Sequence, residues 1–403
     1  MPYDVEAVRA HFPALKAGAA HFDGPGGSQV PDVVADAVGG TLGSAVANRG
    51  LVTTAERTAD DIVLAARAAM ADLLGADPRG VVFGRSMTQL TYDFSRALAK
   101  TWRPGDEVVV TRLDHDANIR PWVQAAEAAG ATVRWVEFDR DTTELTLADV
   151  ERVLSARTVL VAVTGASNLL GTRPPVRAIA DAVHAHDALF YVDGVHLTPH
   201  APVDLVALGA DFYACSPYKF LGPHCGVVAA APELLEQVHP DKLLPSTEEV
   251  PERFELGTLP YELLAGVTAA VDFHATLDDT STGSRPERLR AGMAALEKHE
   301  DALRRRLEDG LALLSGVTVR SRAASRTPTL LLTFEGRSAD EAYEFLAGLD
   351  VNAPAGSFYA IEPSRWLGLG DDGGLRAGLA PYTNEADVDR LLAGLAAYLR
   401  SAG

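Results

Sequence analysis

Short apolar runs recur between residues 81 and 231, and alanine-rich segments with apolar residues at helical spacing separate most of them. This alternation predicts an α/β fold whose large domain has a mainly parallel seven-stranded sheet. We expect the strands at 81–83, 106–111, 131–138, 158–165, 189–193, 211–215 and 226–231.

The pattern changes after residue 273, where a polar stretch rich in Gly, Ser and Thr (276–287) is typical of a connection between domains. We therefore expect an N-terminal segment (1–20) that packs with a small domain, a large domain (21–275), and that small α+β domain (285–403). In the small domain, the pattern predicts helices at 288–314, 339–349 and 385–399, and strands in "VTVRS" and "TPTLLLTF".

The charge and the cysteine content exclude several classes of protein. With 36 basic and 55 acidic residues, the net charge of −19 lacks the basic footprint of a nucleic-acid binder. No apolar run approaches the roughly 18 residues of a membrane span, and the N-terminus does not resemble a signal peptide. The two cysteines, Cys215 and Cys225, have no zinc-type spacing. We expect a cytoplasmic protein that binds neither nucleic acid, membrane nor metal.

The most unusual stretch is "DFYACSPYKFLGPHCG", which places Lys219 in a turn at the end of an apolar strand. Burial there would depress the pKa of the lysine and make its amine a better nucleophile. The alternative is a loop lysine whose ammonium reaches solvent. Asp193 ends the preceding strand in "LFYVDGVH", and its alternative role is to cap the next turn. Because these strands are expected to be neighbours, both side chains would face one pocket.

A lysine and an aspartate in this arrangement suit pyridoxal phosphate. The lysine forms an imine with the aldehyde, and the carboxylate pairs with the pyridinium nitrogen. A phosphate site is expected at the start of the helix in "VVFGRSMTQLTYDFSRALA", where free N–H groups accompany the Thr88 hydroxyl. Ser216 would add a second hydroxyl, although Ser and Thr at a helix start are also ordinary caps.

Seven motifs, in order, resemble the class V aminotransferase group of fold-type-I pyridoxal phosphate enzymes, in its cysteine desulfurase and selenocysteine lyase branch. The resemblance runs from about residue 22 to the C-terminus. The motifs are "FDGPGGSQVP", "VVFGRSMTQL", "TRLDHDANIRPW", "SNLLGTRPP", "YVDGVHLTPHAPVDLVALGADFYACSPYKFLGPHCG", "RFELGTLPYE" and "LRAGLAPYTNEADVDRLL".

The resemblance implies a role for each matching residue. Lys219 is the Schiff-base lysine, Asp193 the partner of the pyridinium nitrogen, and His115 the residue that stacks on the ring. The other implied roles are phosphate binding by Met87 (through its N–H), Thr88, Ser216 and Tyr218, contact with the ring hydroxyl by Asn168 and His196, substrate binding by Arg376 (a fork on the carboxylate) and by Asn168, and phosphate contact across a homodimer interface by Thr258. His196 stands where desulfurases commonly have glutamine, and a histidine can change charge near neutral pH.

The chain departs from cysteine desulfurases in one segment. Their mobile loop carries a nucleophilic cysteine, but residues 349–369 here contain none, and Ser357 lies near its position. Cys215 is expected to be a packing residue, and Cys225 to be structural or near the dimer contact. In the same loop, Phe358, Tyr359 and Trp366 are candidates for shaping the substrate pocket or for core packing.

These features favour a pyridoxal phosphate enzyme that acts on an amino acid by C–S or C–Se lyase type elimination. An aminotransferase or an epimerase uses the same residues and stays open. A non-enzymatic, cofactor-binding scaffold would need neither Lys219 nor Arg376. A Rossmann dehydrogenase is excluded because no GxGxxG follows the first strands. The "DGPGGS" segment is expected to be a loop at the pocket mouth.

Overall fold

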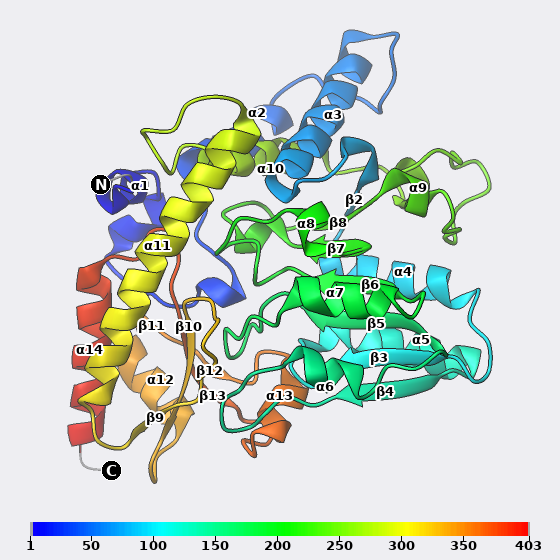
Figure 1. Cartoon of the computed structure of the whole chain (residues 1–403). Helices are drawn as coiled ribbons and strands as arrows, with labels where there is room; N and C mark the ends of the chain where they lie inside the picture. The colour runs from blue at the N-terminus through cyan, green and yellow to red at the C-terminus, as the bar shows by residue number, and fades with distance from the viewer. Residues whose placement is uncertain (1–2, 402–403) are drawn as a thin grey trace.

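A seven-stranded sheet lies at the centre of the part of the chain that the computed structural model describes, residues 3–401 (Figure 1). Its strand order is β2-β8-β7-β6-β5-β3-β4, and β8 alone among these strands runs antiparallel to its neighbours. The predicted α/β fold with a mainly parallel sheet is confirmed. The strands are β2 Val81–Gly84, β3 Glu107–Thr111, β4 Thr132–Val136, β5 Thr158–Thr164, β6 Leu189–Asp193, β7 Phe212–Cys215 and β8 Gly226–Ala230.

The strands read as continuous apolar runs because helices cover both faces of the sheet. Along β5, Val161 and Val163 pack into the core of one face, whereas Leu160 and Ala162 pack into the core of the other. The first core includes residues of α3, α7 and α10, and the second those of α4 and α5. These helices are α3 Thr54–Leu74, α4 Met87–Ala99, α5 Arg120–Ala129, α7 Val176–His184 and α10 Tyr261–His274.

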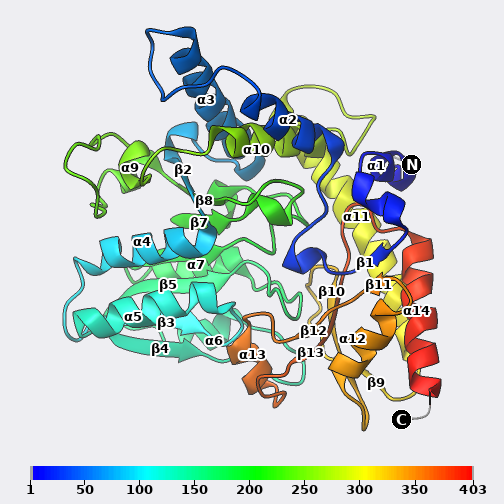
Figure 2. The ribbon, with the colours of Figure 1, turned by 180° about the vertical axis from the view of Figure 1, so that it is seen from behind.

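A second unit lies beside the large sheet, and Figures 1 and 2 show both ends of the chain on its side. Its antiparallel sheet has the order β12-β13-β10-β9. The long helix α11 (Arg285–Ala312) starts with a capping box between Ser284 and Glu287. The other elements of this unit are β9 Val317–Val319, β10 Thr329–Phe334, α12 Ala339–Ala347, β12 Ala355–Gly356, β13 Gly374–Gly378 and α14 Glu385–Arg400.

The N-terminal stretch joins this unit through a two-stranded parallel pair, β1 (Ala20–His21) with β11 (Val351–Asn352). Farther along, Asp23 forms an isolated bridge with Gly378, beside β13. The division into a segment 1–20 and domains 21–275 and 285–403 stays a prediction. Residues 1–2 of that segment and 402–403 of the small domain lie outside the described residues.

The remaining elements are short and connect the larger ones. They are helices α1 Val5–Ala10, α2 Asp32–Leu42, α6 Leu147–Glu151, α8 Leu205–Leu208, α9 Pro232–Leu235 and α13 Ile361–Trp366, with 3₁₀ turns η1 Pro13–Ala17, η2 Gly24–Gly26, η3 Pro78–Gly80, η4 Asp116–Asn118, η5 Pro217–Lys219 and η6 Glu252–Phe254. Within residues 3–401, we find no helix of the length and apolarity that crossing a bilayer requires.

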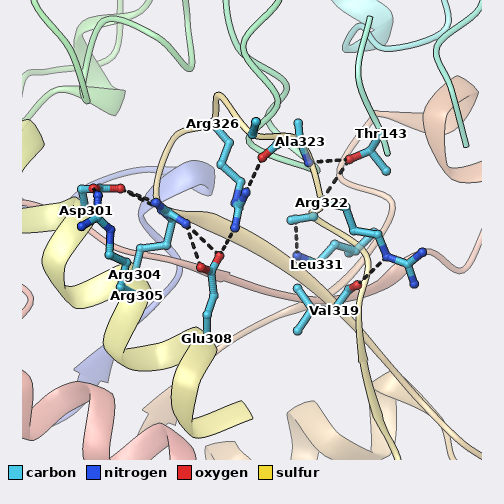
Figure 3. Close-up of polar contacts among 12 residues, drawn as sticks. Thr143, Asp301, Arg304, Arg305, Glu308, Val319, Arg322, Ala323, Arg326 and Leu331 are labelled. Atoms are coloured by element: carbon cyan, nitrogen blue, oxygen red, sulfur yellow. Dashed lines mark hydrogen bonds and ion pairs between the residues drawn. The ribbon is translucent and has the colours of Figure 1, made fainter. Parts of the chain in front are cut away.

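The segment between β9 and β10 connects the second unit to the loops of the large sheet (Figure 3). Arg326 bonds Glu308 of α11 and the carbonyl of Ala323. The hydroxyl of Thr143, in the loop after β4, accepts the amides of Arg322 and Ala323 at 3.0 and 3.1 Å. This segment ends at Thr327 and Thr329, whose hydroxyls contact His196 of the large sheet's loops.

Candidate active site

A cavity of about 640 Å³ opens beyond the carboxyl ends of β5, β6 and β7, where an α/β sheet binds its ligands. Ten of the eleven predicted site residues line it, and they come from segments as far apart as α4 and β13. These ten are Met87, Thr88, His115, Asn168, Asp193, His196, Ser216, Tyr218, Lys219 and Arg376. Thr258 is exposed and does not line this cavity.

Lys219 ends the η5 turn after β7, and its side chain is mostly buried. Its Nζ donates to the carbonyl of Pro25 at 2.6 Å and lies 4.6 Å from the centre of the Tyr218 ring. Burial and the nearby guanidinium of Arg376 lower the pKa of this lysine to about 7, against the opposite influence of Asp193. The amine is therefore largely neutral slightly above neutral pH, as a nucleophile or base requires.

Asp193 is the last residue of β6, which pairs in parallel with β7 as predicted. One carboxylate oxygen accepts the amide of Val195 at 2.9 Å, the local bond expected of an aspartate at a turn. Burial raises the pKa of Asp193 to about 7. A cationic partner in the same buried site would stabilise the ionised form of this carboxyl.

The start of α4 forms a polar wall of the cavity. Ser86 caps this helix by accepting the amide of Gln89 at 3.1 Å, which leaves the N–H groups of Met87 and Thr88 available to an anion. Gly226 of β8 packs against this helix start, and a Cβ there would lie 2.1 Å from the carbonyl carbon of Ser86. Glycine is required at this position because the two backbones touch.

His115 and Asn168 face the cavity from the loops after β3 and β5. Burial, reinforced by the charge of Lys219, lowers the pKa of His115 to about 4, so its imidazole is neutral. Its Nδ1 accepts the amide of Ala117 at 3.0 Å, which places the ring proton on Nε2. Asn168 donates from Nδ2 to the carbonyl of Phe358 at 3.0 Å, while its Oδ1 is buried without a partner.

Two threonine hydroxyls of the second unit contact the ring of His196. Its Nε2 lies 3.1 Å from the hydroxyl of Thr327 and 3.0 Å from that of Thr329, at the end of the segment described above. Burial lowers the pKa of His196 well below its ordinary value. We therefore correct one expectation from the sequence: this histidine is neutral at neutral pH and does not change charge there.

A buried acid–base pair lies directly behind His196. The ring of His196 meets that of His200 edge-on, with centroids 5.0 Å apart. Nδ1 of His200 lies 2.8 Å from Oε2 of Glu300 on α11, and both side chains are buried. No local sequence pattern indicates this pair, because its members are 100 residues apart.

Arg376 projects from β13 and is only 1% exposed. Its Nη1 donates to the carbonyl of Asn168 at 3.1 Å, its Cζ lies 3.6 Å from the centre of the Phe358 ring, and its Nε is buried without a partner. Burial lowers the pKa of the guanidinium to about 9. A buried guanidinium with unused donors is suited to a ligand carboxylate.

The loop 349–369 contributes aromatic residues to the cavity. Phe358 and Tyr359 line the cavity, and the Tyr359 ring stacks on that of His115 with centroids 5.6 Å apart. Trp366 does not line it and instead donates from its indole to the carbonyl of Phe138 at 2.8 Å. Ser357 is also not in the cavity wall.

The two cysteines are free and buried, and burial raises the pKa of both thiols. A thiol with a raised pKa is a poor nucleophile. The residues of the wall that were missed from the sequence include three with polar or charged side chains, Tyr92, Asp116 and Arg120. Tyr92 follows Thr88 by one helical turn, and Asp116 follows His115 directly, so both could have been found from their spacing.

These residues fit pyridoxal phosphate. The amine of Lys219, with its lowered pKa, suits the aldehyde of this cofactor, and the buried carboxyl of Asp193 suits the ring nitrogen. The start of α4 suits the phosphate. The unpartnered Oδ1 of Asn168 and Nε of Arg376 show that the wall has polar atoms for a ligand to satisfy. The loop of Pro25 and Gly26 lies at the cavity, as expected for "DGPGGS".

Comparisons with known proteins agree with this site. The family model "Aminotransferase class-V" matches residues 20–391. An uncharacterized protein of Mycobacterium tuberculosis is 35% identical over 98% of this chain and 99% of its own. A probable cysteine desulfurase of Pseudomonas aeruginosa is 30% identical over 96% of each chain. The crystal structure of a cysteine desulfurase from Escherichia coli superposes with a TM-score of 0.86 at 26% identity, covering 98% of both chains.

Proposed function

The chain belongs to the class V aminotransferase family as a cysteine desulfurase-like enzyme that depends on pyridoxal 5′-phosphate, and from this we propose that it cleaves a C–S or C–Se bond of an amino acid by elimination. One observation carries the proposal. The pocket combines Lys219, Asp193 and Arg376, whereas the loop 349–369 has no cysteine and both cysteines of the chain are buried. An elimination needs the first three groups and no nucleophilic thiol.

Pyridoxal phosphate supplies an aldehyde for the substrate amine and a ring that accepts electrons from the α-carbon. In our proposal, Lys219 holds the aldehyde, Asp193 faces the ring nitrogen and His115 lies against the ring. The phosphate is bound by Met87, Thr88, Ser216 and Tyr218, and the ring hydroxyl by Asn168 and His196. Because Nε2 of His196 faces two threonine hydroxyls, its Nδ1 is the nitrogen for this contact.

The residues of the chain then have separate tasks. Arg376 binds the α-carboxylate of the substrate and so fixes which α-carbon bond faces Lys219. The neutral amine of Lys219 removes the α-proton, and the sulfur or selenium leaves the β-carbon with the electron pair of its bond. For a β-substituted substrate and one water, the products are a thiol or selenol, ammonium and pyruvate.

We also propose that the enzyme is a homodimer in which Thr258 contacts the phosphate of the partner subunit. Thr258 is exposed next to Leu256, which is 53% exposed, and other apolar side chains of the chain are more exposed still. Leu244 is 98% exposed, and Val52, before α3, is 85% exposed. In our proposal, the partner subunit covers these exposed apolar side chains. The unpaired cysteines support a reducing, cytoplasmic setting.

The proposed reaction is tested with purified enzyme and a panel of sulfur- and selenium-containing amino acids. Elimination predicts equal amounts of pyruvate and of sulfide, thiol or selenide, with none from Lys219→Ala. Conversion of the cofactor to its amine form, reversed by a keto acid, would instead identify an aminotransferase. A racemised amino acid without other products would identify an epimerase, and either result would overturn our proposal.

A further inference from the structure

Three residues at the pocket wall hold one another in a closed set of contacts. The guanidinium of Arg376 lies over the ring of Phe358, with Cζ 3.6 Å from the ring centre. Arg376 also donates to the carbonyl of Asn168 at 3.1 Å. Asn168 in turn donates to the carbonyl of Phe358 at 3.0 Å. Each residue therefore fixes the position of the other two.

The backbone of Phe358 is strained, and its surroundings hold it in place. Phe358 and Tyr359 have φ values of 54° and 59°, in the left-handed region that non-glycine residues avoid. The carbonyl of Phe358 accepts the bond from Asn168, and the carbonyl of Tyr359 accepts the amide of Asp116 at 2.8 Å. The amide of Ala360 closes the turn on the carbonyl of Ser357 at 2.9 Å. These hydrogen bonds hold the backbone in the strained conformation that places the Phe358 ring against Arg376.

The environment leaves one edge of the guanidinium for a ligand. The Phe358 ring covers one face, and the carbonyl of Asn168 takes a proton of Nη1. Nε of Arg376 is buried without a partner. Nη2 faces Gly26, which has no side chain, and a Cβ built on Gly26 would lie 3.5 Å from Nη2. A guanidinium offers its N–H groups in the ring plane and is attracted face-on to an aromatic ring, so the two contacts do not compete.

We propose that Phe358 is a positioning residue for the substrate carboxylate, because its ring face holds the guanidinium of Arg376 in the plane that presents its free edge to the pocket. This inference rests on the proposed role of Arg376 in carboxylate binding. Phe358 does not react, and the cofactor is not its target. Its effect is confined to ligands that carry a carboxylate next to the amine.

The test compares two amines that differ only in that carboxylate. Binding of L-alanine and of ethylamine to the holoenzyme is measured from the absorbance of the bound cofactor, for the wild type, Phe358→Leu and Phe358→Tyr. We expect Phe358→Leu to raise the Kd for L-alanine about 30-fold, which corresponds to about 2 kcal/mol for a desolvated cation–aromatic contact. The Kd for ethylamine stays within about twofold, and Phe358→Tyr, which keeps the ring, binds L-alanine like the wild type.

Several outcomes would overturn the inference. An equal loss of affinity for both amines would show that Phe358 acts through the cofactor or the fold, and unchanged affinity for L-alanine would show that it has no role. Cofactor content and melting temperature are measured for each variant, and Phe358→Met replaces Phe358→Leu if the latter does not fold. An Arg376→Leu variant, expected to bind the two amines alike, checks the underlying role of Arg376. Because binding is measured without turnover, a failure of the elimination proposal leaves this test intact.

Discussion

The lowered pKa of Lys219 predicts how the cofactor-free protein captures pyridoxal phosphate at different pH values. The pKa falls from 10.5 to about 7, which corresponds to a free-energy difference on the order of 5 kcal/mol between the two protonation states. At pH 8, an amine with a pKa of about 7 is about 90% neutral, whereas one with a pKa of 10.5 is only about 0.3% neutral. Only the neutral amine attacks the aldehyde, so the buried lysine has about a 300-fold advantage.

Two substitutions should move this pKa in opposite directions. Burial is the main cause of the low pKa, the charge of Arg376 lowers it further, and Asp193 raises it. We therefore expect Arg376→Gln to raise the midpoint of the capture profile and Asp193→Asn to lower it. The effect of Asp193→Asn is the smaller near pH 7, since the carboxyl of Asp193 is then only partly ionised.

The assay mixes cofactor-free protein with pyridoxal phosphate in a stopped-flow instrument and follows absorbance over a range of pH. The ionisations of the cofactor itself are common to all variants, so differences between midpoints report on Lys219. A blocked lysine derivative supplies the reference profile of an exposed amine. Coincident profiles for the three proteins, or a wild-type midpoint equal to that of the reference amine, would refute the reasoning.

Three further predictions concern stability and cofactor binding. Gly226→Ala should displace the start of α4, destabilise the protein by about 1–3 kcal/mol and weaken affinity for the cofactor; equilibrium dialysis of the cofactor and thermal melting check this, and unchanged affinity would contradict it. His200→Ala should destabilise the protein by about 3–5 kcal/mol, because Glu300 then stays buried without its partner; adding Glu300→Gln should restore part of the loss in a melting experiment, and additive losses would speak against the pair. The pKa of Asp193 is raised from 3.8 to about 7, so the folded cofactor-free protein binds more protons than the unfolded one in this window, and its contribution to stability falls as the pH rises through it; melts of wild type minus Asp193→Asn should show this slope, and a flat difference would contradict it.

The sheet could be predicted from the sequence because most of its strands are buried on both faces and read as apolar runs; the edge strand β4, TVRWV, is the more exposed exception. β13 was missed as a strand, since the buried Arg376 interrupts its apolar pattern. The pair of β1 and β11 was also missed, because strands of two residues have no periodicity to detect. Helix ends differed by a few residues: α11 was expected at 288–314 and lies at 285–312.

The candidate site could be predicted in its composition but not in its contacts. Residues that follow parallel strands meet at one edge of a sheet, so Asp193 and Lys219 were expected together. The contacts that support them depend on long-range packing that no local pattern encodes. Thr329 reaches His196 from the second unit, and Phe358 reaches Arg376 through a turn whose left-handed backbone is unusual for an aromatic residue.

The pocket takes residues from both ends of the chain, and this sets the order in which it is completed during synthesis. A nascent chain that has left the ribosome as far as β8 contains Lys219, Asp193 and the helix start of α4. It lacks Arg376, which lies 27 residues from the C-terminus. On the roles proposed above, the lysine for the cofactor is therefore synthesised well before the arginine for the substrate carboxylate.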